Sequence, residues 1–293
     1  MAYRIDKKKN SKEFQKKRVF FEDSPMTREE QKLAGAIAKL DPARGFVDNF
    51  DSFIDFALFP FLANPTEKEV KAFNECKRNE RYLQALQDLG NNSEGYHDSL
   101  GDMFMDNISH GSNSQFFTPE NICEFMAGIT DNQGESVCDP TCGSGRLLLK
   151  GLANSRKHDL EPRLYGCDLD HRCVRMTLLN LCLNSARGDI QWGNSLSMQI
   201  YKTYHIDRVM LGGRWMSFVW QYFDDDDMEE LSNKRRETIL QLASMGIPYE
   251  PPFERQVITI ERPAVEVEQP AEVPAEKPAP SKPSKPVQLQ LEF

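Results

Sequence analysis

The stretch Asp139-Pro140-Thr141-Cys142-Gly143-Ser144-Gly145 decides the fold of this 293-residue chain. It follows a short apolar run that ends at Val137-Cys138, and it opens into Arg146-Leu147-Leu148-Leu149. This order predicts a strand, a glycine turn and a helix. Glycines in such a turn let the backbone approach a ligand, and the free N–H groups at the start of the helix attract a carboxylate or a phosphate. On its own, the loop fits a plain tight turn equally well.

Three neighbouring segments favour a ligand site. Residues 164–168, Leu-Tyr-Gly-Cys-Asp, predict a second strand that ends in Asp168, where a carboxylate is placed to bind both hydroxyls of a ribose. Before the loop, Phe117-Thr118-Pro119 precedes a predicted helix, with Thr118 as N-cap and Pro119 in the first turn. After the loop, residues 188–196 end in Gly-Asn-Ser-Leu. Together these segments point to a nucleotide-like ligand at the ends of two strands.

In this order, the four motifs resemble those of adenine-N6 DNA methyltransferases, and most of all the methylation subunit of type I restriction-modification systems. The resemblance covers residues 95–215. It implies an α/β fold with the Rossmann-like sheet of class I methyltransferases that depend on S-adenosyl-L-methionine (SAM), a role in N6-adenine DNA methylation, and DNA as a partner. No segment resembles a target-recognition domain, so the resemblance also implies a separate specificity or partner subunit.

The same resemblance assigns the residues that bind SAM. It gives Asp168 the ribose, the two glycines of the loop the methionine end, the Phe-Thr-Pro segment a wall of the site, and Asn194 the adenine amine. The implied cofactor-binding residues are Phe117, Thr118, Pro119, Asp139, Pro140, Thr141, Gly143, Gly145, Asp168 and Asn194.

The sequence departs from the family where the target adenine should be held. In the family, Asn-Pro-Pro-Phe or Asp-Pro-Pro-Tyr follows strand four, accepts the adenine N–H bonds and stacks on the flipped base. Residues 206–211 resemble that strand, but Gly212-Gly213-Arg214-Trp215 follows them. Gly212 has no side chain that can accept a hydrogen bond, whereas Trp215 keeps an aromatic ring. We therefore expect a catalytically impaired protein that binds SAM, and no confident catalytic residue.

Two alternatives stay open. Glu250-Pro251-Pro252-Phe253 resembles the missing motif, so the chain could be an active adenine-specific methyltransferase that uses Glu250 and Phe253 or a group from a partner. A Rossmann-like NAD enzyme ranks last, because the loop lacks the three-glycine dinucleotide spacing. Whether the chain is an enzyme on its own is therefore undecided at this point.

The rest of the chain is organised around this domain. We expect a basic disordered arm over 1–25, a helical domain over 26–112, the SAM-binding domain over 113–262 and a proline-rich tail over 263–293. Within the SAM-binding domain, strands are predicted at 136–139, 163–168, 189–192, 206–211 and 256–261, and alternation with helices favours a parallel, doubly wound but shortened sheet.

The composition of the chain restricts the class of protein further. The net charge is −9, but residues 1–18 hold eight basic against two acidic side chains, which suits an arm that contacts phosphates. The seven cysteines form no C-x-x-C pair, so we predict no metal site and a reduced, cytoplasmic setting. No apolar run reaches the length that crosses a membrane.

The end of the chain carries one more motif. Gln288-Leu289-Gln290-Leu291-Glu292-Phe293 resembles the short peptides by which bacterial replication and repair proteins dock on the DNA sliding clamp. In that mode Leu291 and Phe293 would fill apolar pockets while the Gln288 amide makes a hydrogen bond. The sequence therefore predicts the sliding clamp as a further partner.

Overall fold

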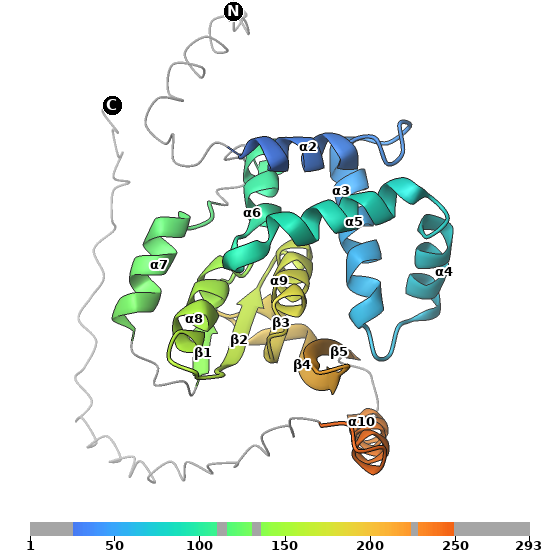
Figure 1. Cartoon of the computed structure of the whole chain (residues 1–293), viewed down its shortest axis with the longest axis vertical. Helices are drawn as coiled ribbons and strands as arrows, with labels where there is room; N and C mark the ends of the chain where they lie inside the picture. The colour runs from blue at the N-terminus through green and yellow to red at the C-terminus, as the bar shows by residue number, and fades with distance from the viewer. Residues whose placement is uncertain (1–25, 110–115, 131–135, 224–227, 249–293) are drawn as a thin grey trace, which may run out of the picture. The chain divides into compact units, whose positions relative to one another are not determined.

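The computed structural model describes residues 26–109, 116–130, 136–223 and 228–248 (Figure 1). The predicted basic arm, the strand at 256–261, the residues Glu250 and Phe253, and the terminal motif with Gln288, Leu291 and Phe293 lie outside these residues.

The N-terminal part is helical, as the sequence predicts. Its helices are α2 (Arg28–Ile37), α3 (Phe46–Leu58), α4 (Glu67–Cys76), α5 (Glu80–Asn92) and α6 (Ser99–Phe104), with short 3-10 helices at Phe59–Phe61 and Glu94–Tyr96 and a π-helical turn at Met105–Ser109. Thr27 and Thr66 both form capping boxes. After Thr66 the chain forms two helices, because Asn79 starts a new one by accepting a hydrogen bond from Arg81 N at 3.1 Å.

The five-stranded sheet begins with the three strands that the sequence predicts. Strands β1 (Ser136–Asp139), β2 (Arg163–Asp168) and β3 (Gly188–Asn194) are parallel neighbours. Helices α7 (Glu120–Ile129), α8 (Arg146–Arg156) and α9 (His171–Leu183) come before and between them. This β-α-β-α-β arrangement is the expected one, and it brings the carboxyl ends of β1 and β2 to the same edge of the sheet.

The second half of the sheet corrects the sequence prediction. Strand β4 (Gln199–Leu211) pairs antiparallel with β3, and β5 (Arg214–Phe223) pairs antiparallel with β4. The expected parallel strand at 206–211 is wrong for a physical reason. Only residues 195–198 separate β3 from β4, whereas a parallel crossover needs roughly a dozen residues. Among the described residues the strand order is β1-β2-β3-β4-β5, so β1 lies at one edge of the sheet that they form.

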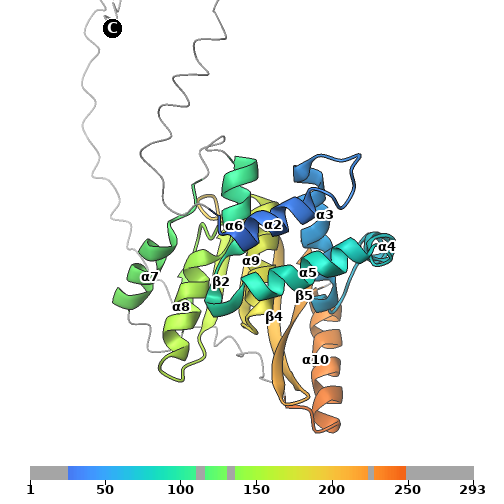
Figure 2. The same cartoon turned by 45° about the horizontal axis from the view of Figure 1, so that its top comes forward.

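Helices cover the two faces of this sheet unequally. Ile206 faces the main core, while its neighbour Asp207 points to the opposite face and pairs with Arg235 at 2.6 Å. Helices α8 and α9 thus cover one face, and α10 (Met228–Ser244) lies against the other beside the β4–β5 hairpin (Figure 2). On that second face, Tyr165 is 37% exposed and Cys138 is also exposed.

Contacts between distant segments join the helical region to the sheet. Arg172 and Arg175 of α9 pair with Asp51 of α3 at 2.6 and 3.0 Å. Asn64, in the loop after α3, exchanges hydrogen bonds with the backbone of Gln221 in β5. One set of buried residues runs from Leu33 and Phe53 to Leu179 and Val219, so the helical region and the sheet share a core. Within the described residues, no helix combines the length and the apolar character that a membrane crossing requires.

Candidate functional site

The glycine loop connects β1 to α8 in the conformation that its sequence predicts. Gly143 and Gly145 have φ angles of +56° and +84°, which residues with a side chain rarely adopt. A Cβ on Gly143 would lie 2.9 Å from the ring of Phe117, and one on Gly145 would lie 2.9 Å from Thr177 Cγ2. Both positions therefore require glycine for space as well as for backbone conformation.

Asp168, at the carboxyl end of β2, binds the backbone of the glycine loop. Its Oδ2 accepts a hydrogen bond from Gly143 N at 2.8 Å, and its Oδ1 accepts one from Asp170 N at 2.8 Å. Burial raises the pKa of Asp168, and these two N–H groups oppose that shift. At the end of β1, burial likewise raises the pKa of Asp139, whose Oδ1 accepts from Thr141 N at 3.0 Å.

A cavity of about 260 Å³ lies between these groups. Six of the residues predicted to bind a cofactor line it: Phe117, Thr118, Asp139, Thr141, Gly143 and Asp168. Phe117 is fixed from behind by Phe104, whose ring stacks on it with centroids 5.2 Å apart. The cavity thus has an aromatic wall, a glycine loop and two carboxylates at the carboxyl ends of neighbouring parallel strands.

The other predicted residues lie near the cavity or away from it. Pro119, Pro140 and Gly145 adjoin lining residues without lining the cavity themselves. Asn194 ends β3, and its Oδ1 accepts hydrogen bonds from Leu196 N at 3.0 Å and Ser197 N at 3.2 Å. Its amide oxygen therefore stabilises the turn that follows β3.

Gly212 and Trp215 are not at the site, which corrects their assignment to the acceptor position. Because β4 runs antiparallel to β3 and its pairing continues to Gly188, residues 207–211 extend beyond the amino end of β3. Gly212 and Gly213 form the turn between β4 and β5, with φ angles of +57° and +78°. The ring of Trp215 packs under the Arg208 guanidinium, 4.9 Å away. The turn therefore lies at the end of the sheet opposite the cavity.

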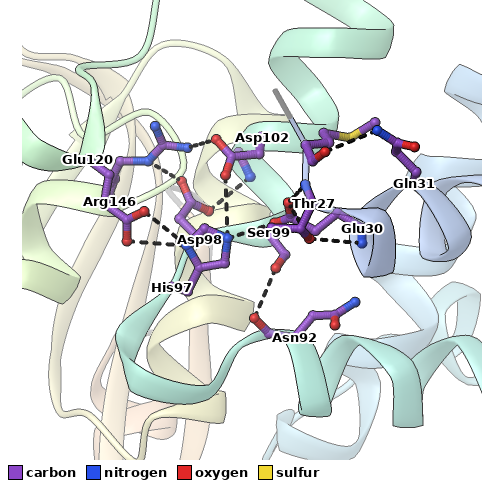
Figure 3. A network of polar contacts seen from close by, with 12 residues as sticks. Thr27, Glu30, Gln31, Asn92, His97, Asp98, Ser99, Asp102, Glu120 and Arg146 are labelled. Atoms are coloured by element: carbon purple, nitrogen blue, oxygen red, sulfur yellow. Dashed lines mark hydrogen bonds and ion pairs between the residues drawn. The ribbon is translucent and has the colours of Figure 1, made fainter. Parts of the chain in front are cut away.

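Sequence reasoning missed a buried aspartate that supports the loop from the helical region. Asp98 is fully buried and accepts a hydrogen bond from Arg146 Nε at 3.0 Å (Figure 3). It also accepts hydrogen bonds from Ser144 Oγ and from Asn180 Nδ2, the latter at 2.8 Å. It also caps α6 by accepting from Gly101 N at 2.9 Å. The sequence marks Asp98 only as an N-cap, since its partners lie more than 40 residues further along the chain.

Arg146 extends this support to the wall of the cavity. Its guanidinium bonds Asp102 at 2.6 Å and the Thr118 carbonyl at 3.3 Å. Burial works to lower the pKa of Arg146, but its interactions with Asp98 and Asp102 together have the larger effect. The pKa is therefore raised overall, and the guanidinium stays cationic. Burial raises the pKa of Asp102 to about 6 despite the arginine. Arg146 thus ties α6 to the segment before α7.

A charged histidine completes the network. His97 lies between Glu120 of α7, 3.0 Å from its Nδ1, and Glu30 of α2, 2.7 Å from its Nε2 (Figure 3). Hydrogen bonds to Glu120 and Glu30 raise the pKa of His97 to about 10. The bond to His97 lowers the pKa of Glu120 to about 2. Burial works against the ionised Glu30, yet the bond to His97 lowers its pKa to about 2 as well. His97, just ahead of α6, therefore joins α2 to α7 through two ion pairs.

The remaining lining residues include Cys123, Cys142 and Cys173, which are buried, and Ser144. Burial raises the pKa of Cys123 to about 11 and also raises that of Cys142 and Cys173. These thiols are thus neutral and act as apolar packing. Among the described residues, Glu30, His97 and Asp102 are the group with metal-ligand spacing, but an ion pair already satisfies them.

Comparison with known proteins assigns the chain to a family. Residues 96–243 match the family N-6 DNA Methylase, and the chain belongs to this family. A relative is the Type I restriction enzyme MjaIX methylase subunit of Methanocaldococcus jannaschii, which is 26% identical over 146 residues. That match covers 47% of this chain and 24% of the relative, so the chain matches about a quarter of the relative's length.

Two solved structures are similar to part of this chain. One is a type I restriction-modification methyltransferase subunit from Streptococcus thermophilus, with 18% identity, a TM-score of 0.30, and coverage of 66% of this chain and 45% of the other. Another, from Listeria monocytogenes, is assigned to the class I S-adenosylmethionine-dependent methyltransferases, with 17% identity, a TM-score of 0.37, and coverage of 58% and 55%.

Proposed function

We propose that this chain binds SAM in the cavity between β1 and β2 and takes part in N6-adenine methylation of DNA. One observation carries the proposal: within the residues that match the methylase family, the glycine loop and Asp168 line one cavity with Phe117 and Thr118. SAM carries a ribose with two hydroxyl groups, a cationic sulfonium and an ammonium group. Two carboxylates and a ring wall suit those groups.

Four of the predicted residues are assigned roles from their positions. Asp168 would take the ribose hydroxyls with the lone pairs that Gly143 N and Asp170 N leave free. Asp139 would face the ammonium or the sulfonium, because both carry the charge that a carboxylate attracts. Phe117 would pack against the adenosine. Asn194 would contribute less to SAM binding, because its amide oxygen already accepts a hydrogen bond within the turn after β3.

The test is calorimetric titration of the full chain with SAM, with NAD as the comparison ligand. We expect SAM to bind, NAD not to bind, and Asp168→Ala to weaken SAM at least tenfold, since a hydrogen bond to a charged group contributes about 1.5–3 kcal/mol. Asp106→Ala is the matched control, because Asp106 is exposed and does not line the cavity. An unchanged affinity in Asp168→Ala would overturn the assignment, and tight binding of NAD would favour an oxidoreductase.

We further propose that the purified chain transfers no methyl group to adenine by itself. Methyl transfer needs acceptors that orient the adenine amine, and the residue placed there by sequence, Gly212, lies at the opposite end of the sheet. A tritiated-methyl assay on mixed DNA should therefore stay at background. Formation of N6-methyladenine that disappears in Glu250→Ala would instead support an active enzyme that uses Glu250 and Phe253.

The proposed partners are DNA and a subunit that supplies sequence recognition. Docking on the sliding clamp through Gln288, Leu291 and Phe293 stays a prediction from sequence. A peptide of residues 280–293 should bind the clamp and should lose that binding when Leu291→Ala and Phe293→Ala are combined. A wild-type peptide without affinity for the clamp would remove this partner.

A further inference from the structure

The three most exposed large apolar side chains of the described residues lie at the cavity end of the sheet. Leu196 and Met198, in the turn between β3 and β4, are 94% and 79% exposed. Phe116, which lines the cavity, is 72% exposed. Single exposed apolar residues are ordinary on a protein surface, but a group gathered at one site marks a place of interaction.

The register of the sheet places the β3–β4 turn beside the cavity. Trp192 of β3 pairs with Asp168 of β2, so the two residues lie at the same level on neighbouring strands. Gly193 and Asn194 continue β3 past that level before the chain turns. Each strand residue adds about 3.3 Å and neighbouring strands lie about 4.8 Å apart, so the tip of the turn projects roughly 10 Å beyond the level of Asp168.

The turn is held in one conformation although part of its backbone is strained. Asn194 Oδ1 accepts hydrogen bonds from the backbone of Leu196 and Ser197. Met198 has a φ of +58°, a conformation that glycine or asparagine normally supplies in a hairpin loop. The chain therefore carries a methionine where glycine would be less strained. Residues 193–201 contain no charged side chain, so the tip presents apolar groups and no cation for a phosphate.

We propose that Leu196 and Met198 form an apolar wedge that enters the DNA base stack when the target adenine is drawn out toward the cavity. The inference rests on the proposed function. DNA is the occupant because the tip stands beside the candidate cofactor cavity of a chain that belongs to the N-6 DNA Methylase family. An uncharged tip suits the interior of the duplex better than its phosphates.

The chemistry of the reaction gives the wedge its role. An adenine has to leave the duplex before its amine can reach the methyl group, and its neighbours then lose their stacking contacts. Protruding apolar side chains that insert at such a step hold it open. Phe116, at the cavity itself, has an exposed ring on which the extruded base can stack.

The experiment uses the full chain with saturating SAM and a short duplex that carries 2-aminopurine, a fluorescent adenine analogue, opposite an abasic site. The abasic site lowers the cost of extrusion, so no recognition sequence is needed. We expect the fluorescence to rise on binding, and Leu196→Ser to reduce that rise at least tenfold while SAM affinity stays within twofold. Leu83→Ser, at a leucine of α5 that is 52% exposed, is the matched control and should change neither value. No rise with the wild type, or an equal rise in Leu196→Ser, would overturn the proposal.

A second variant separates contact with DNA from a structural role of the turn. Met198→Gly removes the side chain and the backbone strain together, so the chain should unfold at no lower temperature while the fluorescence rise falls. A full rise in this variant would contradict the assignment of Met198 to the wedge.

A photoreactive leucine analogue at position 196 identifies what the tip touches in the same mixture of chain, SAM and duplex. We expect an adduct on a nucleobase. An adduct only on deoxyribose or phosphate, an adduct on a second copy of the chain, or no adduct would each count against the wedge. If SAM still binds in that sample, the proposed function stands without the wedge. If SAM does not bind at all, the proposed function fails first and the wedge fails with it.

Discussion

The carboxylate of Asp98, fully buried ahead of α6, accepts a hydrogen bond from the hydroxyl of Ser144 in the glycine loop. The two residues are 46 positions apart in the sequence and belong to the helical region and to the β1–α8 loop. Because Asp98 also bonds Arg146 and Asn180, the loop is held by a residue outside the strand-turn-helix motif that contains it. The helical region therefore positions the candidate cofactor site.

Changing Asp98→Asn should both destabilise the chain and weaken SAM. The amide nitrogen cannot accept from Ser144 and Arg146, and the guanidinium would lose a buried charged partner, a loss that typically costs about 3–5 kcal/mol. Thermal unfolding and SAM titration of the same sample measure the two effects. Asp88→Asn, in α5 and away from the cavity, is the control; equal effects from both substitutions would contradict the supporting role.

Gly143→Ala should weaken SAM at least tenfold. The alanine Cβ would meet the Phe117 ring at 2.9 Å and the backbone would be strained at a φ of +56°, so the ring or the loop has to move. Gly90→Ala is the matched control, since nothing lies within 4 Å of its added Cβ and it sits in α5, where alanine should add about 0.5–1 kcal/mol of stability. Normal SAM affinity in Gly143→Ala would show that the ligand does not depend on this loop.

The ion pairs of His97 predict a dependence of stability on pH. Its pKa of about 10 in the folded chain lies above its ordinary value of 6.5, so protonation stabilises the fold fully below pH 6.5 and this contribution disappears as the pH rises through 10. The difference in free energy of unfolding between the wild type and His97→Gln should therefore shrink from pH 6.5 to pH 10. Denaturant titrations at several pH values measure it. His158→Gln, at an exposed position, is the control substitution.

Two adjacent residues of α10, Arg235 and Lys234, allow a matched test of how this helix is held on the second face of the sheet. Arg235 bonds Asp207, which is 4% exposed, whereas Lys234 bonds Glu230 in a pair that is more than half exposed. Arg235→Ala should cost about 3 kcal/mol because it leaves a buried carboxylate without this cation. Lys234→Ala removes an ion pair that is open to solvent, so it should change stability much less. Hydrogen exchange of α10 should rise in the first variant alone. Similar exchange in both would mean that this ion pair does not hold the helix.

The sequence predicts the first half of the fold and fails at β4 for an identifiable reason. Helices α7 to α9 and strands β1 to β3 follow from apolar runs, caps and glycines that lie close together in the chain. The reversal at residues 195–198 depends on the length of a turn, and the apolar pattern of 206–211 is the same for a parallel and an antiparallel strand.

Within the candidate site, local motifs and distant contacts were not equally predictable. Six of the residues assigned from motifs line the cavity, because a glycine loop and a strand-ending acid are local signals. Asp98 and Arg146 were missed because nothing in the segments around them indicates that they meet. The acceptor position was misplaced because its assignment depended on the direction of one strand.

The turn at Gly212-Gly213 also has a consequence for the order in which the chain folds. Both glycines have positive φ, as a tight hairpin turn requires, and β4 and β5 pair from Leu211↔Arg214 through Lys202↔Phe223. A hairpin of this kind closes in about 1–10 μs, because its partners are close in sequence, whereas parallel pairs such as Ser136↔Arg163 must first close long loops. We expect the hairpin to form early and to serve as the template against which β3, then β2 and β1, are added, so that the strand bordering the cavity is the last to be fixed.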